Sequence, residues 1–208
     1  MLIIGAKGFA KEVLEIFHQQ NKTDGIYFYD DVTDDLANFL YQFPIIKSLE
    51  KAKELFKTDN RFTIGIGNSQ VRYTLYKRFI DIGGQFESSV SPFAHIGHFE
   101  TKIGDGCNIM TGAILTNNIT IGEGCLINLN CTIGHDTILG RFTELSPSVS
   151  ISGNCILGEF CNIGTNATIL PKVKLGNRVT VGAGAVVTKD VADGLTVVGI
   201  PAKPINKK

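Results

Sequence analysis

The feature that most constrains this chain is a ladder of aliphatic residues with a period of six. Every sixth residue from 103 to 187 is Ile, Leu or Val. The ladder positions are Ile103, Ile109, Leu115, Ile121, Ile127, Ile133, Leu139, Leu145, Ile151, Leu157, Ile163, Ile169, Leu175, Val181 and Val187. A period of six fits neither an amphipathic helix nor a plain alternating strand, but it is typical of a parallel β-helix built from hexapeptides. We therefore expect short strands that each point one aliphatic side chain inward, with three hexapeptides closing one triangular coil.

The five cysteines share the phase of this ladder. Cys107, Cys125, Cys131, Cys155 and Cys161 are separated by 18, 6, 24 and 6 residues, and each follows a ladder position by four. Because the repeat explains where they stand, we interpret them as small core residues rather than as metal ligands or a disulfide framework. The residue directly after a ladder position is often glycine, which the pattern assigns to a turn.

Residues 1–87 lack the six-residue rhythm and predict a small parallel α/β sheet. The segments "LIIG", "GIYFYDD" and "RFTIGIGN" are composed like buried strands, and amphipathic helices are predicted after the first and the third. Alternating strands and helices are typical of a Rossmann-like domain. We therefore expect an α/β Rossmann-like domain at residues 1–87 and a β-helix with a C-terminal cap at residues 88–208. One spacing of seven, from Ile96 to Ile103, precedes the unbroken ladder.

Three turns of the first domain are predicted to meet at one edge of its sheet. The turn "GAKGF" joins the first strand to a helix whose N-terminal N–H groups can hold a phosphate, while "DD" and "GIGN" end the other two strands. Ligands of open α/β sheets bind at the carboxyl ends of strands, so these turns predict a nucleotide site. The candidate contacts are Gly5, Lys7, Gly8, Phe9, Asp30, Asp31, Gly67 and Asn68. The Gly-x-Gly-x-x-Gly fingerprint is absent, so a purely structural first turn stays open.

The composition argues against several kinds of partner. Twenty basic and twenty acidic residues cancel, which disfavours a nucleic acid or an anionic membrane surface. The first residues lack the positively charged N-terminal region and the apolar stretch of a signal peptide. The sequence also has no run of about 18 apolar residues, so no membrane-spanning helix is predicted. We therefore expect a cytoplasmic protein.

One ionisable pair, His135-Asp136, stands in the stretch "NLNCTIGHDTILG", which otherwise consists of aliphatic, glycine and small polar residues. His135 follows the inward Ile133 by two residues, so we expect it on a turn near the surface. The repeat requires nothing of this position, and an imidazole can act as a general base near neutral pH. The other three histidines lie outside the unbroken ladder, so a three-histidine zinc site is disfavoured and no metal is expected.

A carboxylate bonded to the second ring nitrogen would fix the tautomer of His135. Asp136 and Glu144 are the candidates for this role. Adjacent residues on a strand point to opposite faces, which counts against Asp136. Glu144 lies nine residues beyond the histidine, in another hexapeptide, and a solvated surface charge is an equal alternative for it. The sequence leaves the partner of His135 open.

The chain as a whole resembles the hexapeptide-repeat transferases, and within them one bacterial family. The resemblance rests on the opening "IIGAKGFAKEV", on "IGHD" within the hexapeptide repeat, and on the closing "VVGIPAK". This combination is similar to the acetyltransferases that N-acetylate nucleotide-linked amino sugars and to the related sialic acid O-acetyltransferases. It implies a left-handed β-helix, a nucleotide-sugar-binding N-terminal domain, acetyl-CoA as cosubstrate and a homotrimer.

The resemblance also implies roles for individual residues. His135 becomes the general base, the backbone N–H of Gly153 one coil later stabilises the oxyanion, and Asn128 contacts the sugar. The implied contacts of acetyl-CoA are Gly153, Thr165, Ala183, Pro201 and Lys203. Three positions depart from the family: Phe9 stands where relatives often have a polar residue, Asp136 where glutamate is common, and Glu144 where some have a second histidine.

Three functions follow from these observations. The first is acetyl-CoA-dependent N-acetylation of a UDP- or dTDP-linked 4-amino-4,6-dideoxy sugar. The second is O-acetylation of a sialic acid or a similar sugar. The third is a sugar-nucleotide-binding scaffold without catalytic activity.

Overall fold

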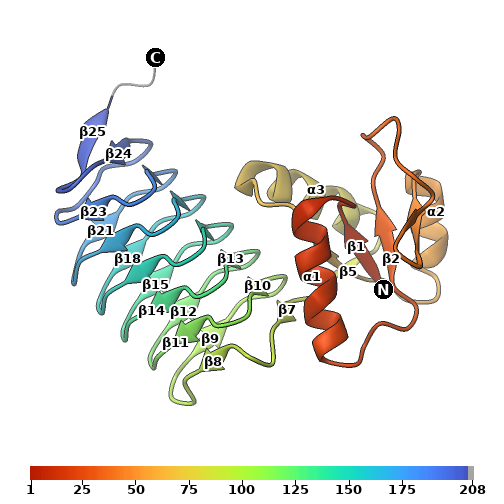
Figure 1. Cartoon of the computed structure of the whole chain (residues 1–208), viewed down its shortest axis with the longest axis horizontal. Coiled ribbons are helices and arrows are strands. Elements are labelled where there is room, and N and C mark those ends of the chain that lie inside the picture. Colours follow the sequence, from red (N-terminus) through yellow and green to blue (C-terminus); the bar gives the residue numbers. More distant parts are fainter. Residues whose placement is uncertain (206–208) are drawn as a thin grey trace.

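The computed structural model describes residues 1–205, which form an α/β domain packed against the lower coils of a β-helix (Figure 1). Residues 206–208, which the expected β-helix domain includes, lie outside the described residues. The first domain has a six-stranded sheet in the order β3-β4-β2-β1-β5-β6. Its elements are β1 (Leu2–Ile4), α1 (Gly8–Gln19), β2 (Tyr27–Tyr29), β3 (Phe39–Leu40), β4 (Phe43–Ile46), α2 (Leu49–Leu55), β5 (Arg61–Ile64), α3 (Ser69–Asp81) and β6 (Gln85–Phe86).

The three strands expected in this domain are present and pair in parallel, with β1 between β2 and β5. The antiparallel hairpin of β3 and β4 was not expected, nor were α2 and the edge strand β6. These elements are short and carry little periodic signal, which explains why the sequence pattern did not reveal them.

The second domain is a parallel β-helix with three faces, each made of strands stacked one per coil (Figure 1). Face 1 contains β7 (Ser89–Val90), β10 (Asn108–Ile109), β13 (Leu126–Ile127), β16 (Glu144–Leu145), β19 (Asn162–Ile163) and β22 (Thr180–Val181). Face 2 contains β8 (His95–Ile96), β11 (Ile114–Leu115), β14 (Thr132–Ile133), β17 (Ser150–Ile151), β20 (Thr168–Ile169) and β23 (Val186–Val187). Face 3 contains β9 (Lys102–Ile103), β12 (Thr120–Ile121), β15 (Ile138–Leu139), β18 (Ile156–Leu157) and β21 (Lys174–Leu175). A final hairpin, β24 (Thr196–Val198) and β25 (Lys203–Ile205), extends face 1.

The aliphatic ladder fills the interior of this β-helix, as expected. From Ile109 to Val187 each ladder side chain is at most 3% exposed. The ordered coils begin one turn before the unbroken ladder, because Val90 pairs with Ile109 and Ile96 with Leu115. The extra residue before Ile103 is therefore absorbed in the turn between β8 and β9, and the stack above it keeps its register.

The glycines that follow ladder positions serve a different purpose from the one expected. A positive φ occurs three residues after the ladder position instead, for example at Asp136 (58°) and Asn154 (60°). The glycine directly after the ladder is needed because coils stack closely. A Cβ at Gly122 would lie 2.5 Å from the backbone nitrogen of Arg141 in the next coil, closer than any real contact. Steric approach between coils, not turn conformation, selects these glycines.

All five cysteines are free and buried in the β-helix core. Burial raises the pKa of the Cys131 thiol to about 11 and also raises the pKa of Cys125, Cys155 and Cys161. We expect an aromatic disulfide reagent at pH 8 to modify no cysteine in the native protein and five after unfolding. Absorbance of the released thiolate measures this, and rapid labelling of the folded chain would contradict the packing.

The first domain lies against face 1 at the lower coils (Figure 1), where the outward residues Asn108 and Leu126 are buried. The buried Asn108 donates to the carbonyl of Ile64 at 2.8 Å, so the end of β5 is tied directly to β10. Phe9 of the first turn packs half-buried with Met110 and Leu126 between the two domains. No helix within residues 1–205 has the length and apolar character needed to cross a bilayer.

Candidate active site

His135 lies on the turn between β14 and β15, at the corner where face 2 meets face 3, and its side chain is 63% exposed. Its Nδ1 atom is 2.7 Å from an oxygen of Asp136. The hydrogen bond to the imidazole holds the pKa of the Asp136 carboxyl below its usual range. Asn118 donates to the other carboxylate oxygen at 3.2 Å from the preceding coil. The turn therefore presents a histidine with one ring nitrogen already engaged.

The expectation that neighbouring side chains would diverge is wrong at this pair. Asp136 is not on a strand but has a left-handed backbone with φ of 58°, the conformation that recurs at the corners of the β-helix. This conformation turns the carboxylate back toward the ring of the preceding residue. Aspartate and asparagine tolerate it better than most residues do, because their short polar side chains bond locally.

Gly153 lies one coil beyond His135, directly beneath the imidazole ring. A Cβ at this position would meet His135 Nε2 at 2.7 Å and Cε1 at 2.8 Å. Equivalent positions of other coils carry ordinary side chains such as Asn117 and Arg141, so the repeat itself does not require glycine here. Among residues 1–205 the N–H of Gly153 bonds to no acceptor. The glycine therefore leaves both a space for the ring and a free donor beside Nε2.

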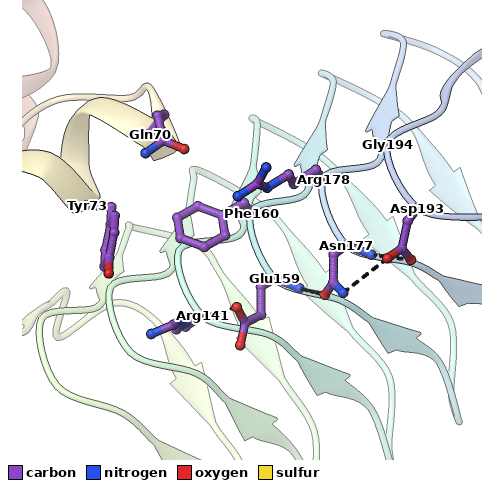
Figure 2. A pocket seen from close by; sticks show the side chains of 9 residues that line it. All are labelled: Gln70, Tyr73, Arg141, Glu159, Phe160, Asn177, Arg178, Asp193 and Gly194. Carbon is purple, nitrogen blue, oxygen red and sulfur yellow. Dashed lines mark hydrogen bonds and ion pairs between the residues drawn. The ribbon is translucent and has the colours of Figure 1, made fainter.

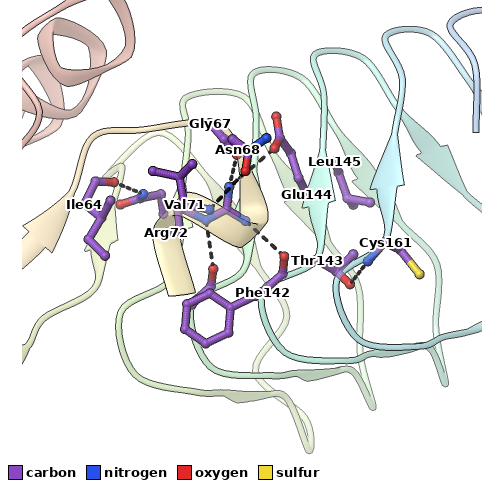
Figure 3. A network of polar contacts seen from close by, with 12 residues as sticks. Ile64, Gly67, Asn68, Val71, Arg72, Phe142, Thr143, Glu144, Leu145 and Cys161 are labelled. Atoms are coloured by element: carbon purple, nitrogen blue, oxygen red, sulfur yellow. Dashed lines mark hydrogen bonds and ion pairs between the residues drawn. The ribbon is translucent and has the colours of Figure 1, made fainter. Parts of the chain in front are cut away.

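Glu144, the other candidate partner, lies on β16 of face 1 and not at the corner of His135. Its carboxylate pairs instead with the buried Arg72 of α3, at 3.4 Å (Figure 3). Within the chain it is Asp136 that contacts the imidazole. Arg72 was missed by the sequence analysis, although one signal was available, since it stands two helical turns before the buried Phe79 on the inner face of α3.

The turns expected to bind a nucleotide lie together at the carboxyl edge of the first sheet. Gly5 has a φ of 102° and approaches Gly65 so closely that a Cβ would lie 3.0 Å from its carbonyl oxygen. Gly8 faces open space, so no packing contact of this chain explains it. Lys7 is exposed just before α1, and Asn68 caps α3 by accepting from the N–H of Val71 at 3.0 Å.

The two aspartates at the end of β2 are already engaged within their own domain. Asp30 accepts from the backbone N–H groups of Val32 and Thr33 at 3.1 and 3.0 Å. Asp31 accepts from the hydroxyl of Tyr29 and pairs with Arg78 at 2.7 Å. Burial opposes ionisation of Asp31, but the bonds from Arg78 and Tyr29 outweigh it and hold its pKa below the usual value. A ligand at this end of the sheet would meet carboxylates that are already oriented.

The residues expected to bind acetyl-CoA fall at two separate corners. Gly153 shares the corner of His135, between faces 2 and 3, whereas Thr165 and Ala183 lie at the corner between faces 1 and 2. Asn128, which was expected to contact the sugar, lies at this second corner too. Thr165 and Ala183 are exposed, and Asn128 is half-buried. One chain therefore does not bring all of these residues to one place.

The C-terminal hairpin holds the remaining candidates. Pro201 follows a cis peptide bond, and Lys203 begins β25. Both line a cavity of about 470 Å³ that also receives Lys189. Two lysines, Lys189 and Lys203, thus line the same cavity. Within the described part of the chain, no three His, Cys, Asp or Glu side chains gather as a metal site would require.

A further cleft of about 550 Å³ lies on the opposite side of α3, at the corner between faces 3 and 1 (Figure 2). Tyr73, Phe160 and Arg178 line it, and Arg141 pairs with Glu159 at 3.0 Å beside them. None of the residues predicted from the sequence belongs to this cleft. The candidate site therefore consists of the carboxyl edge of the first sheet and the corner of His135.

Two family models match parts of the chain. Residues 1–79 match the PglD N-terminal domain, and residues 154–189 match the bacterial transferase hexapeptide family of six repeats. No curated protein matches the chain by sequence.

Three solved structures are similar over almost their whole length. The acetyltransferase domain of PglB from Neisseria gonorrhoeae, solved in complex with acetyl coenzyme A, is 32% identical, with 98% of each chain covered and a TM-score of 0.90. WeeI from Acinetobacter baumannii gives the same identity, coverage and TM-score. PerB from Caulobacter crescentus, solved with CoA and GDP-perosamine, is 26% identical, with a TM-score of 0.91 over 99% of this chain and 96% of that one. The chain belongs to the left-handed β-helix sugar N-acetyltransferase family. The expected fold class is thereby confirmed.

Proposed function

We propose that this acetyltransferase acylates the amino group of a nucleotide-linked 4-amino-4,6-dideoxy sugar, with His135 as the general base. Membership of the family makes the protein an acetyl-CoA-dependent sugar N-acetyltransferase. The observation that carries the assignment of the base is the arrangement at one corner, where Asp136 engages Nδ1 at 2.7 Å and Gly153 leaves room and a free N–H beside Nε2.

The chemistry of the transfer matches these groups. Asp136 accepts a hydrogen bond from Nδ1–H, so the neutral ring presents the lone pair of Nε2 to the substrate amine. The amine attacks the thioester carbonyl and loses its proton to Nε2, while the N–H of Gly153 donates to the oxyanion. Collapse of the tetrahedral intermediate breaks the C–S bond, and the imidazolium returns the proton to the leaving thiolate. The products are the sugar amide and free CoA.

The division of the coenzyme contacts between two corners supports an assembly in which copies share each site. His135 and Gly153 of one copy would face Thr165 and Ala183 of the next around a symmetry axis along face 2. A ring of three copies closes such a head-to-tail contact. We therefore propose a homotrimer, in which the first domain of one chain carries the sugar toward His135 of its neighbour.

The sugar nucleotide is bound, in this proposal, at the carboxyl edge formed by Gly5, Gly8 and the turn at residues 67–68. Open space at Gly8 and the exposed Lys7 fit a diphosphate at the start of α1. The sequence led us to expect uridine or thymidine, whereas PerB was solved with GDP-perosamine. All three bases therefore belong in the test.

The decisive experiment is a thiol-release assay with acetyl-CoA and UDP-, dTDP- or GDP-linked 4-amino sugars. We expect turnover with at least one of them and an N-acetylated product by mass spectrometry. Turnover with sialic acid alone would replace this proposal with O-acetylation. Binding of both ligands without thiol release would indicate the scaffold.

Asp136→Asn is the substitution that isolates the role of the carboxylate. Asparagine occupies the equivalent left-handed position at Asn118 and Asn154, so the turn should be retained. Loss of the charge removes the group that fixes the tautomer, and because the pair is exposed we expect a fall in kcat of about 10²-fold, less than for a buried triad. Steady-state kinetics check this, and an unchanged kcat would mean that Asp136 serves only the turn.

A further inference from the structure

Arg72 is the most deeply buried charge of the domain junction, with a side chain only 1% exposed. Its guanidinium reaches both domains (Figure 3). It donates to the carbonyl of Gly67 in its own domain, and across the junction to the carbonyls of Gly124 at 3.3 Å and Phe142 at 3.2 Å. The guanidinium also donates to the carboxylate of Glu144 at 3.4 Å. One side chain thus joins the end of the β5 turn to two successive coils of the β-helix.

The turn that Arg72 holds is part of the proposed nucleotide edge. Asn68 caps α3, and its carbonyl accepts the first backbone bond of the helix from the N–H of Arg72 at 2.9 Å. The side chain of Arg72 adds the bond to the carbonyl of Gly67. On the other side, a Cβ at Gly67 would lie 3.5 Å from Glu144 Oε1. The turn at residues 67–68 is therefore fixed between Arg72 and Glu144 and cannot shift along face 1 without breaking these bonds.

Stability alone does not explain this arrangement. A buried ion pair costs desolvation free energy, and apolar side chains of similar volume often replace such a pair without loss of stability. Burial does raise the pKa of the Glu144 carboxyl, against the attraction of Arg72. What a planar guanidinium provides and an apolar side chain does not is a set of directed bonds that fixes geometry.

One of the two coils that receive these bonds is the coil of the proposed base. β14, which precedes His135, and β16, which carries Glu144, are two sides of the same turn of the β-helix. In an assembly whose symmetry axis runs along the β-helix, His135 of the neighbouring copy lies at the same height. A nucleotide bound at the turn would then hold its sugar at the level where acetyl transfer occurs.

We propose that Arg72 is a positioning residue, anchored by Glu144, that sets the height of the sugar nucleotide relative to His135. This inference rests on the proposed function. A displacement of about 1 Å between reacting groups can cost about 10²-fold in rate, so loss of these bonds is expected to affect the sugar step strongly. Binding of acetyl-CoA, which the proposal assigns to other corners, should change little.

The test compares Arg72→Met and Arg72→Lys with Gln20→Ala. Gln20 donates to the carbonyl of Val90 at 2.6 Å, so this control also removes a bond between the domains, but far from the turn. For Arg72→Met we expect kcat/KM for the sugar nucleotide to fall about 10- to 10²-fold while KM for acetyl-CoA stays within about twofold. Arg72→Lys should recover part of the loss, and Gln20→Ala should match the wild type. The proposal would be overturned if a folded Arg72→Met enzyme had wild-type kinetic constants. It would also be overturned if the variant bound the sugar nucleotide and acetyl-CoA equally more weakly than the wild type.

Glu144→Gln keeps the experiment decisive if Arg72→Met does not fold. The amide has the same shape and can still accept a bond from Arg72, but it removes the charge that anchors the guanidinium. We expect kcat/KM for the sugar nucleotide to fall less than in Arg72→Met, with KM for acetyl-CoA unchanged. Wild-type constants in Glu144→Gln would count against the role of Glu144 as the anchor.

Calorimetric titration with UDP, dTDP and GDP separates the positioning role from the proposed function. If no sugar is acetylated by the wild type, the proposed function fails, whereas the positioning role still predicts weaker nucleotide binding in Arg72→Met than in Gln20→Ala.

Discussion

Replacing His135 with alanine should lower kcat by about 10²- to 10⁴-fold, the usual contribution of a positioned general base. The side chain is 63% exposed and fills no core, so the chain should fold and assemble as the wild type does. KM for both substrates should change little, because the base acts on the proton and not on the nucleotide or the pantetheine. Thiol-release kinetics measure the effect, and circular dichroism and light scattering check the fold and the assembly.

His98 provides a matched control for this experiment. It lies two residues after the inward Ile96, at the same corner as His135 but in an earlier coil, and it is also exposed. His98→Ala removes an imidazole from an equivalent turn and should leave kcat unchanged. If His135→Ala retained near-normal turnover, or if the two variants lost activity equally, His135 would not be the base.

Replacing Gly153 with alanine should be nearly as damaging, although it adds only a methyl group. The new Cβ would lie 2.7 Å from Nε2 of His135, so the ring must rotate away from its position against Asp136. The backbone of Gly153 does not have a positive φ, so an alanine at this position would not strain the backbone. We expect kcat to fall about 10²-fold through misplacement of the base.

A double-mutant cycle tests the cause of this effect. If the methyl group acts through the imidazole, Gly153→Ala lowers the Tm in the wild-type background but not in His135→Ala, where the space above residue 153 is empty. Thermal unfolding of the four proteins gives the coupling. An equal loss of Tm in both backgrounds would mean that the methyl group disturbs the coil itself.

The most local part of the structure was predictable from the sequence. A hexapeptide repeats its environment at each turn of the chain, so the inward ladder and the buried cysteines follow from periodicity alone. The same regularity made His135 conspicuous, because nothing in the repeat calls for it. The predicted strands of the first domain were found, whereas α2 and the hairpin of β3 and β4 were too short to leave a pattern.

Other features depend on contacts that sequence spacing does not reveal. The left-handed backbone of Asp136 brings two adjacent side chains together, against the alternation expected of a strand. The need for glycine at position 153 comes from a ring that lies one coil away. Arg72 was missed because its acceptors are spread between residues 67 and 144 and converge only when the two domains pack.

The sequence by itself determined the β-helix, its register and the histidine that stands out from it, because these depend on a repeat in which each residue is read against its neighbours six places away. Only the tertiary structure decided which carboxylate meets the imidazole and why residue 153 has no side chain. It also decided how the proposed nucleotide edge is tied to the coil of His135. Directed bonds and steric contacts between coils and between domains fix those features, and such contacts depend on distance in space and not on position along the chain.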